Sequence, residues 1–296
     1  MNSVLVSIII PTYDDWKRLS LCINALAGQA FSNNMFEVII VNNNPSDFVP
    51  ENFFLPENFK IITEENPGSY AARNAGLRTA KGEIIGFTDS DCIPDKNWIK
   101  NAVAYFTANK ACSRIAGKVS IFFETKNPTS AELYDKLYAF HQKTYVENSG
   151  TCVTANLFAY KHVFDKIGYF NEKLMSGGDF SWGTVAHKNG FKIDYVEDVV
   201  VNHPARKNLK ELVKKERRVG GSQALFLEKS NNKFFFVLKL LKEMMPDLSS
   251  LKYIFIDEKN MSITDKISVY ITRQYLLRIR AYEKFRVQMG KKANRA

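Results

Sequence analysis

Short, continuous apolar runs alternate with amphipathic segments through the first 110 residues. Each run ends at polar or turn-forming residues, which is typical of strands buried on both faces of a parallel sheet. The predicted strands span 4–10, 36–41, 60–63 and 84–87, and the predicted helices span 69–80 and 96–107, with a further helix that begins at Asp14 or Asp15. This alternation predicts an α/β fold, with a mainly parallel, Rossmann-like sheet covered by helices on both faces.

The pattern changes after residue 110. It predicts a strand at 114–123, helices at 131–142 and 180–188, and a loop at 147–152. From residue 208 onward the periodicity is helical only, at 208–229, 234–244 and 263–289. We therefore predict two domains: residues 1–205, which carry the sheet, and residues 206–296, a basic C-terminal helical region.

The composition is that of an ordinary globular protein, with 45% hydrophobic and 24% charged residues among 296. No apolar run approaches the roughly 18 residues of a membrane span. The first apolar run has no basic segment before it and ends early at Pro11, so it predicts a strand and not a signal peptide. The four cysteines include no CxxC pair, which excludes a zinc knuckle and indicates a reducing compartment. We therefore expect a cytoplasmic protein, at the inner face of the cell membrane if the basic region binds lipid.

Positive charge is concentrated in the last third of the chain. Residues 1–204 contain 19 Lys and Arg against 22 Asp and Glu, a balance of −3, whereas residues 205–296 contain 22 against 9, a balance of +13. This asymmetry indicates a membrane surface, nucleic acid or a charged substrate as partner, or simply a solvated helical surface. We take forward contact with an anionic membrane and expect no nucleic-acid partner.

The last predicted helix gives this interpretation a geometry. Lys266, Arg273 and Arg280 recur every seven residues and predict a basic stripe beside an apolar face. The residues of that face are Ile263, Ile267, Tyr270, Ile271, Leu277 and Phe285. The alternative is that the face packs against the first domain or a second subunit, and Arg278, which falls within it, would suit a buried ion pair. The sequence leaves the oligomeric state open.

Three predicted strands end in polar or turn-forming segments, at residues 11–13, 42–44 and 89–91. Ligands of open α/β sheets bind at the carboxyl ends of the strands, so these segments are predicted to line one crevice. The sequence contains neither a GxGxxG after the first strand nor a GxxxxGK[ST] motif. A dinucleotide-binding fingerprint and a P-loop nucleotidase are therefore excluded.

Asp89 and Asp91 flank a single small residue at the end of a buried strand. Two carboxylates at this spacing need charge compensation, which a magnesium or manganese ion supplies, and such an ion also binds phosphate oxygens. The structural alternative is that Asp91 or Asp95 caps the helix predicted at 96–107.

The order of several motifs resembles that of the inverting family 2 glycosyltransferases. Residues 6–13 (VSIIIPTY) look like the opening strand of that family. The other motifs are Asn66-Pro67-Gly68, Ala72-Arg73-Asn74-Ala75-Gly76, Ala80-Lys81-Gly82-Glu83, Asp89-Ser90-Asp91, Pro94, Trp98, Thr154-Ala155-Asn156, Gly168-Tyr169-Phe170-Asn171-Glu172 and Gly177-Gly178-Asp179. The resemblance spans residues 4–204. It implies a GT-A fold, a nucleotide-sugar donor, here a UDP-sugar, and a divalent metal ion, Mn²⁺ or Mg²⁺.

The resemblance also implies roles for individual residues. The implied donor-binding residues are Pro11, Thr12, Tyr13, Asn42, Asn66, Arg73, Asn74, Asp89, Ser90 and Asp91, the implied metal ligands are Asp89, Asp91 and His203, and the implied acceptor-side residues are Asn156, Gly177 and Gly178. From the residues alone, His203 can equally be a structural histidine. Arg73 can form a surface ion pair instead of binding phosphate.

Asp179 is the candidate catalytic base. The attacking hydroxyl must lose its proton, and a carboxylate on the face of the sugar opposite the leaving group can accept it. A metal ion at Asp89 and Asp91 would stabilise the charge on the leaving diphosphate. Asp179 follows two glycines and opens the helix predicted at 180–188, so a helix cap is the alternative from the residues alone, and the resemblance favours the base.

Three features depart from the family pattern. Asn42 stands where an acidic residue usually binds the nucleobase, although an amide can still donate and accept hydrogen bonds. Gly178 and Ser181 stand where acids are common, which leaves Asp179 as the sole acid of its motif. No QxxRW sequence is present, which favours addition of single sugars over processive synthesis.

The leading hypothesis is therefore an inverting, metal-dependent glycosyltransferase that moves one sugar from a nucleotide-sugar to a hydroxyl of a saccharide or lipid-linked acceptor. By analogy, the pathway would be bacterial surface-polysaccharide or glycolipid synthesis. A sugar nucleotidyltransferase and a non-catalytic nucleotide-sugar-binding module are the alternatives. Asp179 argues against the nucleotidyltransferase, because displacement of pyrophosphate by a sugar phosphate needs no such base.

Overall fold

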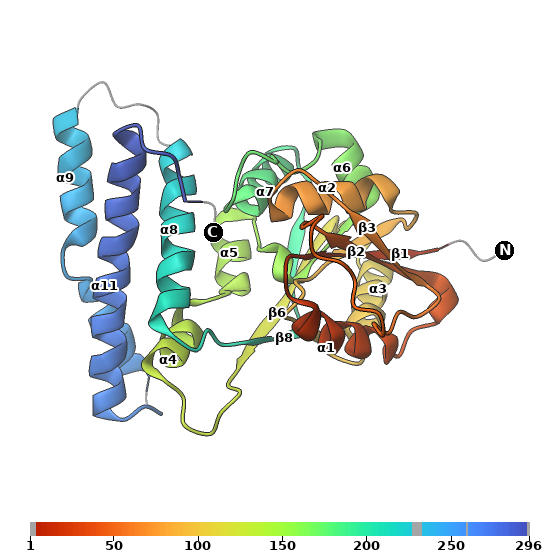
Figure 1. Ribbon diagram of the computed structural model, residues 1–296, viewed down its shortest axis with the longest axis horizontal. Helices are drawn as coiled ribbons and strands as arrows, with labels where there is room; N and C mark the ends of the chain where they lie inside the picture. Colours follow the sequence, from red (N-terminus) through yellow and green to blue (C-terminus); the bar gives the residue numbers. More distant parts are fainter. Residues whose placement is uncertain (1–3, 227–232, 259, 295–296) are drawn as a thin grey trace. The chain divides into compact units, whose positions relative to one another are not determined.

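The computed structural model describes residues 4–226, 233–258 and 260–294, which form two compact units (Figure 1). The first unit contains the chain up to Ser120 together with Phe140–Leu174 and Gly178–Pro204. The second contains Ile121–Ala139, Met175–Gly177 and the chain from Ala205 onward. That residues 1–205 and 206–296 fold as separate domains stays a prediction.

The described part of the first unit is built on one eight-stranded sheet with the strand order β3-β2-β1-β4-β7-β6-β8-β5. The strands are β1 (Val6–Thr12), β2 (Phe36–Asn42), β3 (Phe59–Thr63), β4 (Ile84–Phe87), β5 (Ile93–Pro94), β6 (Arg114–Phe122), β7 (Leu157–Tyr160) and β8 (Ile193–Pro204). β1 pairs in parallel with β2 and β4, and β2 pairs in parallel with β3. β7 is antiparallel to β4 and β6, and β5 is antiparallel to β8. The predicted α/β fold is confirmed, with its parallel part in the first four strands.

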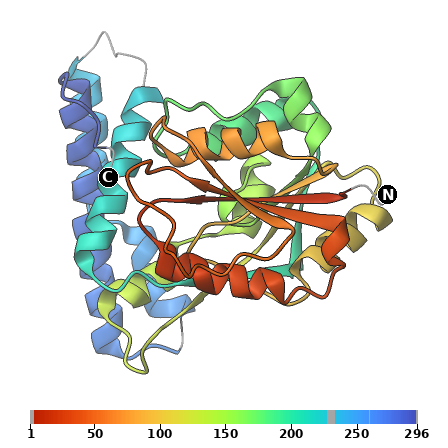
Figure 2. The same ribbon diagram turned by 45° about the vertical axis from the view of Figure 1, so that its right-hand side comes forward.

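Helices cover both faces of this sheet (Figure 2). They are α1 (Trp16–Ala27) and α3 (Trp98–Ala108) on one face, and α2 (Ser69–Thr79), α6 (Lys161–Ile167) and α7 (Gly178–Lys188) on the other. Ile8 and Ile10 of β1 pack with α1 and α3, whereas Ile9 packs with α2. Successive side chains of a strand point to opposite faces, so a strand covered on both sides must be continuously apolar. This explains the uninterrupted apolar run that predicted β1.

The segment between residues 130 and 152 differs from the prediction. The chain forms α4 (Ser130–Tyr138) and α5 (Gln142–Ser149), where one helix at 131–142 and a loop at 147–152 were expected. α4 begins with a capping box, in which the Thr129 hydroxyl accepts from the Glu132 N–H and Glu132 accepts from the Thr129 N–H. Phe140 has a φ of 55°, which interrupts the helical conformation before α5 begins. The prediction was wrong here because this turn contains neither glycine nor proline.

The second unit is helical. It contains α4, α8 (Leu209–Phe226), α9 (Lys233–Met244), α10 (Leu248–Lys252), a π-helical turn (Tyr253–Asp257) and α11 (Ile263–Gln288). α11 packs against α8, α4 and α9, and its Val269 and Leu276 share a core with Leu212 of α8 and Ile254. α8, α9 and α11 correspond to the helices predicted at 208–229, 234–244 and 263–289, and residues 227–229 lie outside the described residues. Within the described chain, no helix is long and apolar enough to cross a membrane.

The predicted basic stripe on the last helix is wrong. Lys266 is buried and donates to the Phe255 carbonyl, while Arg273 pairs with Asp247 at 3.2 Å. Arg280 Nε lies 2.5 Å from Glu216 Oε2. A spacing of seven residues does keep these cations on one side of α11, but that side packs inside the helical unit, where Arg273 and Arg280 are paired with acids and Lys266 is bonded to a carbonyl.

Asn156 joins three parts of the sheet and its cover. Its side chain is completely buried; its Oδ1 accepts from Trp98 Nε1 at 2.9 Å, and its Nδ2 donates to the carbonyls of Lys118 and Val199. Its amide group therefore serves the protein's own structure, although the sequence suggested an acceptor-side role.

Asn156→Ala is expected to destabilise the first unit by about 3 kcal/mol, because it leaves a buried indole N–H and two buried carbonyls without a partner. Urea unfolding followed by tryptophan fluorescence tests this, since Trp16, Trp98 and Trp182 all belong to the first unit. Asn189→Ala, which removes only an exposed bond to the Val185 carbonyl, is the control. Equal midpoints for the two variants would contradict the structural role of Asn156.

Candidate active site

The carboxyl ends of β2, β1 and β4 lie side by side, because these strands are parallel neighbours in the sheet. β1 ends at Thr12, which is paired with Asn42 at the end of β2, and Asp89 follows β4. Thr12 is buried and its hydroxyl has no hydrogen-bond partner among the described residues, whereas Tyr13 is 63% exposed. A buried hydroxyl without a partner is unusual in a native protein, so a ligand bound at this edge can supply the missing bond.

Arg73 orients the first aspartate of the Asp89-Ser90-Asp91 segment. Its Nη2 lies 2.5 Å from Asp89 Oδ1, and its Nη1 donates to the Ser69 carbonyl. Arg73 is only 4% exposed and Asp89 is half-buried, so this pair is buried on the arginine side and differs from the surface pair considered from the sequence. The guanidinium thus has a carboxylate partner already, and phosphate binding by Arg73 stays a prediction.

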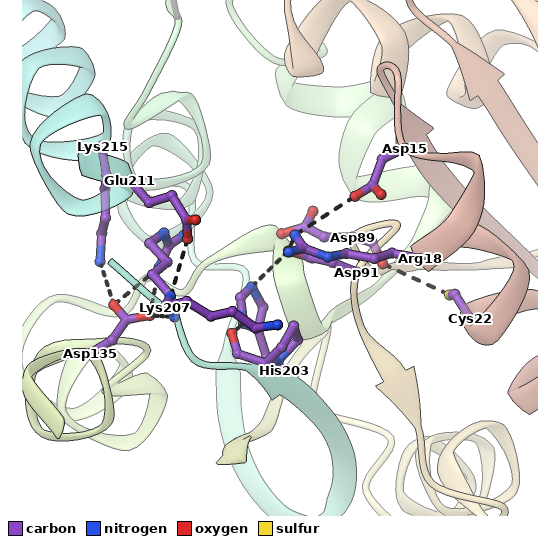
Figure 3. Close-up of polar contacts among 12 residues, drawn as sticks. Asp15, Arg18, Cys22, Asp89, Asp91, Asp135, His203, Lys207, Glu211 and Lys215 are labelled. Atoms are coloured by element: carbon purple, nitrogen blue, oxygen red, sulfur yellow. Dashed lines mark hydrogen bonds and ion pairs between the residues drawn. The ribbon is translucent and has the colours of Figure 1, made fainter. Parts of the chain in front are cut away.

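Asp91 is approached by side chains from two other elements (Figure 3). His203, from the end of β8, has its Nε2 3.4 Å from Asp91 Oδ2. Arg18 of α1 has its Nη1 4.0 Å from the same oxygen and 3.9 Å from Asp15 Oδ2. Asp91 is not a helix cap, because Asn97 is the N-cap of α3 and its N–H bonds to Asp95.

The Asp91 and His203 pair fits a divalent cation. His203 Nδ1 lies 2.7 Å from the Pro204 carbonyl, which can only accept, so the proton is assigned to Nδ1. In the neutral imidazole the Nε2 lone pair then faces a carboxylate oxygen, an arrangement that a cation between them would stabilise. Cys92 lies in the same group, whose ligand atoms are within 4.8 Å of one another, but burial raises the pKa of its thiol well above the usual value. A protonated thiol is a poor ligand for Mn²⁺ or Mg²⁺.

Asp179 is held at the start of α7 by groups from separate segments. Its Oδ1 accepts from the Tyr70 hydroxyl at 3.0 Å, and its Oδ2 accepts from the Thr154 N–H at 3.3 Å. It also accepts from the N–H of the next residue, Phe180, but α7 already begins at Gly178, so Asp179 lies within the helix and is not its N-cap. Burial raises the pKa of Asp179, although the nearby Arg73 charge and these hydrogen bonds act in the opposite direction. A fixed carboxylate with a raised pKa is suited to accepting a proton.

The two glycines before Asp179 have different structural reasons. Gly177 has a φ of 76°, in the left-handed region that favours glycine. At Gly178 a Cβ atom would lie 2.8 Å from the Tyr70 ring, so only glycine lets that ring reach Asp179. Gly178 thus acts on the site through Tyr70, and an acceptor-side role for either glycine stays a prediction.

Several predicted donor-site amides are bonded to the protein itself. Asn74 donates to the Phe170 carbonyl and accepts from the Phe170 N–H. Asn42 donates to the Asp47 carbonyl and accepts from the Asn44 N–H within its loop. Asn66 is exposed. Pro11 and Ser90 lie at the strand ends, half-buried. The geometry therefore leaves Tyr13, Asn66 and the aspartates as groups at this edge that a donor can reach, with the unpartnered Thr12 hydroxyl buried beneath them.

Arg18 and Tyr70 were missed by the sequence reasoning. Arg18 reaches Asp91 from the first turn of α1, and its sequence spacing from Asp91 carries no signal. Tyr70 stands two residues after Gly68, at the start of the helix that follows the Asn66-Pro67-Gly68 motif, so its place at the site could have been suspected. Its partner Asp179 is 109 residues away, and only the fold brings the two together.

Several known proteins are similar to this chain in sequence or in fold. Residues 7–168 match the family described as Glycosyl transferase family 2. Glycosyltransferase AglE of Haloferax volcanii is 34% identical over 230 residues, which cover 75% of each chain. A Methanococcus voltae protein named dolichyl N-acetyl-alpha-D-glucosaminyl phosphate 3-beta-D-2,3-diacetamido-2,3-dideoxy-beta-D-glucuronosyltransferase is 23% identical over 301 residues, 92% of each chain. The mannosyltransferase PcManGT from Pyrobaculum calidifontis, solved in complex with GDP-Man and Mn²⁺, has a TM-score of 0.55 and 15% identity, covering 98% of this chain and 77% of that chain.

The sheet and its helical cover, together with the likeness to PcManGT, define a GT-A fold. The family match extends over more than half of the chain, and AglE exceeds 30% identity over three quarters of it. The chain therefore belongs to glycosyl transferase family 2. It is a nucleotide-sugar glycosyltransferase of this inverting family.

Proposed function

We propose that this glycosyltransferase moves a single sugar from a UDP-sugar to a hydroxyl of a saccharide or lipid-linked acceptor, with inversion at the anomeric carbon and with a bound divalent metal ion. The observation that carries the proposal is Asp179, a buried carboxylate held by Tyr70 and Thr154 in the same unit as the Asp89-Ser90-Asp91 segment. One carboxylate is thus available for the acceptor and two for the donor side.

The proposed reaction is one displacement. Asp179 accepts the proton of the acceptor hydroxyl, whose oxygen forms a bond to the anomeric carbon as the bond between that carbon and the diphosphate oxygen breaks. The electron pair of the broken bond leaves with the nucleoside diphosphate. Attack from the face opposite the leaving group inverts the anomeric configuration, so a product of retained configuration, detected by NMR, would exclude this mechanism.

The residues proposed to hold the metal ion are Asp91 and His203, with Asp89 beside them. A divalent cation there would supply a Lewis acid that offsets charge on the departing diphosphate. The manganese in PcManGT supports a bound divalent cation, and the facing acceptor atoms of Asp91 and His203 support its place. Arg73 keeps Asp89 in place, and Arg18 adds a second positive group beside Asp91.

The acceptor is proposed to be lipid-linked. The name of the Methanococcus voltae relative describes a transferase that acts on a dolichyl-phosphate-linked sugar, and its similarity covers 92% of each chain. A lipid-linked acceptor fits glycolipid or surface-polysaccharide synthesis, which the sequence suggested by analogy.

Incubation of the purified chain with Mn²⁺ and UDP- or GDP-sugars tests the function. Release of nucleoside diphosphate that depends on an added acceptor is expected. Release of pyrophosphate from a nucleoside triphosphate and a sugar phosphate would instead identify a nucleotidyltransferase. Donor binding without turnover on any acceptor would favour a non-catalytic module. The GDP-sugars are included because PcManGT binds GDP-Man and because Asn42 leaves nucleobase preference open.

Tyr70 is proposed as a positioning residue for Asp179. Its hydroxyl hydrogen bond favours the ionised carboxylate and lowers the pKa of Asp179 against the effect of burial. Tyr70→Phe removes that bond, so the pKa of Asp179 rises and the acid limb of the kcat profile moves to higher pH. We expect kcat at neutral pH to fall by about tenfold, the usual weight of one hydrogen bond to a charged group.

The control for this prediction is Tyr105→Phe, which removes another tyrosine–aspartate bond, from Tyr105 to Asp194 at 3.2 Å. It should leave the pH profile unchanged. The KM for the donor should be unaffected by Tyr70→Phe, because Tyr70 contacts the acceptor-side carboxylate. The other titratable side chains that face Asp179 are Arg73 and Cys152, and both variants retain them. A uniform loss of rate at all pH values would reduce Tyr70 to a packing role.

A further inference from the structure

α11 exposes a continuous row of large apolar side chains. Their spacing of three or four residues places them on one face of the helix over its whole length. The row, which we call the α11 ridge, consists of Ile263, Ile267, Ile271, Tyr275, Tyr282, Phe285 and Met289, with Arg278 in its middle. Ile263 and Ile271 are each 62% exposed, although both are strongly apolar. Burying such a row is favourable, so it indicates an interaction surface.

The neighbouring helix α9 also exposes apolar side chains. α9 packs against α11 in the second unit. It exposes apolar side chains of its own, and the residue after its end does the same. These residues are Val237, Leu238, Leu241, Met244 and Met245. Methionine and leucine side chains adapt to irregular or fluid surroundings, which suits a surface without a fixed partner shape.

The exposed charges of these helices are of one sign. Three acidic side chains of this region are paired within the unit, Asp247 with Arg273, Glu243 with Lys284 and Glu283 with Arg286, while the half-buried Asp265 in the first turn of α11 accepts from the Ser262 hydroxyl. By contrast, every charged side chain that the structure describes as exposed on α9, α10 and α11 is a cation. These cations are Lys239, Lys242, Lys252 and Arg278. An apolar ridge on a helical unit whose exposed cations have no acidic partner among the described residues matches a surface that is apolar inside and anionic outside.

We propose that the α11 ridge docks on an anionic lipid surface, with its apolar side chains at the boundary of headgroups and acyl chains. The exposed lysines then lie at the level of the phosphates, where each contributes to binding. The attachment uses Ile263, Ile267 and Ile271. It does not involve Lys266, Arg273 and Arg280, whose side chains are bonded to partners inside the helical unit.

Arg278 discriminates lipid from a second copy of the chain. A long arginine stem can lie along apolar surface while its guanidinium reaches the headgroups. In a pairing of two ridges, Arg278 would be buried opposite apolar and aromatic side chains, while Glu243 of α9 and Glu283 of α11 are already paired. An unpaired buried charge is costly, so the ridge favours lipid over self-association.

Sedimentation with vesicles tests the proposal on the full-length chain. We expect binding to vesicles of phosphatidylglycerol and phosphatidylcholine, little binding to phosphatidylcholine alone, and weaker binding as salt is added. The double variant Ile267→Glu/Ile271→Glu should reduce the partition coefficient by about tenfold or more, because it removes buried apolar area and adds charge repelled by the lipid. The variant Lys239→Gln/Lys242→Gln should weaken binding to anionic vesicles without changing the apolar ridge.

The matched control is Leu21→Glu/Val185→Glu, which adds the same charge at exposed apolar positions of the first unit, on α1 and α7. It should bind vesicles like the unchanged chain, and circular dichroism establishes that each variant is folded. Equal binding to neutral and anionic vesicles would overturn the proposal. So would an equal loss of vesicle binding in Ile267→Glu/Ile271→Glu and in the control Leu21→Glu/Val185→Glu. So would light scattering that shows a dimer which Ile267→Glu/Ile271→Glu dissociates, because a second copy would then cover the ridge.

Discussion

Replacing Asp179 with asparagine is expected to lower kcat by about a hundredfold or more, the scale of general base catalysis. The amide keeps the shape of the carboxylate, and its single oxygen can still accept from the Tyr70 hydroxyl, although its NH2 group then faces the Thr154 N–H and that weaker bond is lost. It cannot take the proton of the acceptor hydroxyl. The Kd of the donor, measured by calorimetry, should change little, because Asp179 is proposed to act on the acceptor.

Stability provides a control for this variant. Burial raises the pKa of Asp179 in the folded chain above its pKa in the unfolded chain. The ionised carboxylate therefore opposes folding once the pH rises above the unfolded-chain pKa. Asp179→Asn should therefore unfold at no lower temperature than the unchanged chain at neutral pH. Asp194→Asn, at the other tyrosine-bound aspartate, should retain activity. If donor binding collapses while the rate with bound donor persists, Asp179 is a donor-side residue and the assignment is wrong.

The fold was predictable where local pattern and tertiary environment agree. β1, β2 and β4 are buried on both faces, so their sequences are continuously apolar and their polar ends are abrupt. Parallel strands that are neighbours bring those ends together, and the residues at 11–13, 42–44 and 89–91 were placed correctly on that ground. The break at Phe140 was not predictable, because a positive φ at a phenylalanine has no local sequence signature.

The side of a helix that packs could not be predicted from periodicity. Spacing shows that Lys266, Arg273 and Arg280 share one side of α11. It does not show whether that side is buried or exposed, because residues on either side of a helix recur at the same spacing. The acidic partners of Arg273 and Arg280, Asp247 and Glu216, lie 26 and 64 residues away along the chain. Only the tertiary structure shows that this side packs inside the unit and that the row from Ile263 to Met289 is the exposed one.

The candidate site also combines features that the sequence indicates with features that only the tertiary structure shows. A motif indicates which residues gather, but the partner of each polar atom depends on the fold. Asn74 and Asn156 belong to motifs of the family, and their amides bond to backbone atoms of other segments. Arg73 was expected on a phosphate and lies on Asp89. Asp179 combines a motif position with a buried hydrogen-bonding environment, which makes it the strongest candidate for chemistry.

Asp91→Asn is expected to abolish turnover and to weaken Mn²⁺ binding, because a hard divalent cation needs the ionised carboxylate. An asparagine oxygen can face His203 Nε2 but carries no charge to hold the ion. Calorimetric titration of Mn²⁺, with and without nucleoside diphosphate, separates loss of the metal ion from loss of the reaction. His203→Gln should weaken Mn²⁺ binding as well, since His203 is the second group directed at the same place.

Asp95→Asn is the matched control for Asp91→Asn. Asp95 lies four residues away in the same segment, and its carboxylate only accepts from the Asn97 N–H before α3, which an amide oxygen can also do. Its variant should bind Mn²⁺ and turn over like the unchanged chain. If Asp91→Asn, properly folded, retains Mn²⁺ affinity and activity, the facing acceptors of Asp91 and His203 belong to a structural pair, and Arg18 and Arg73 become the groups that must offset the diphosphate charge.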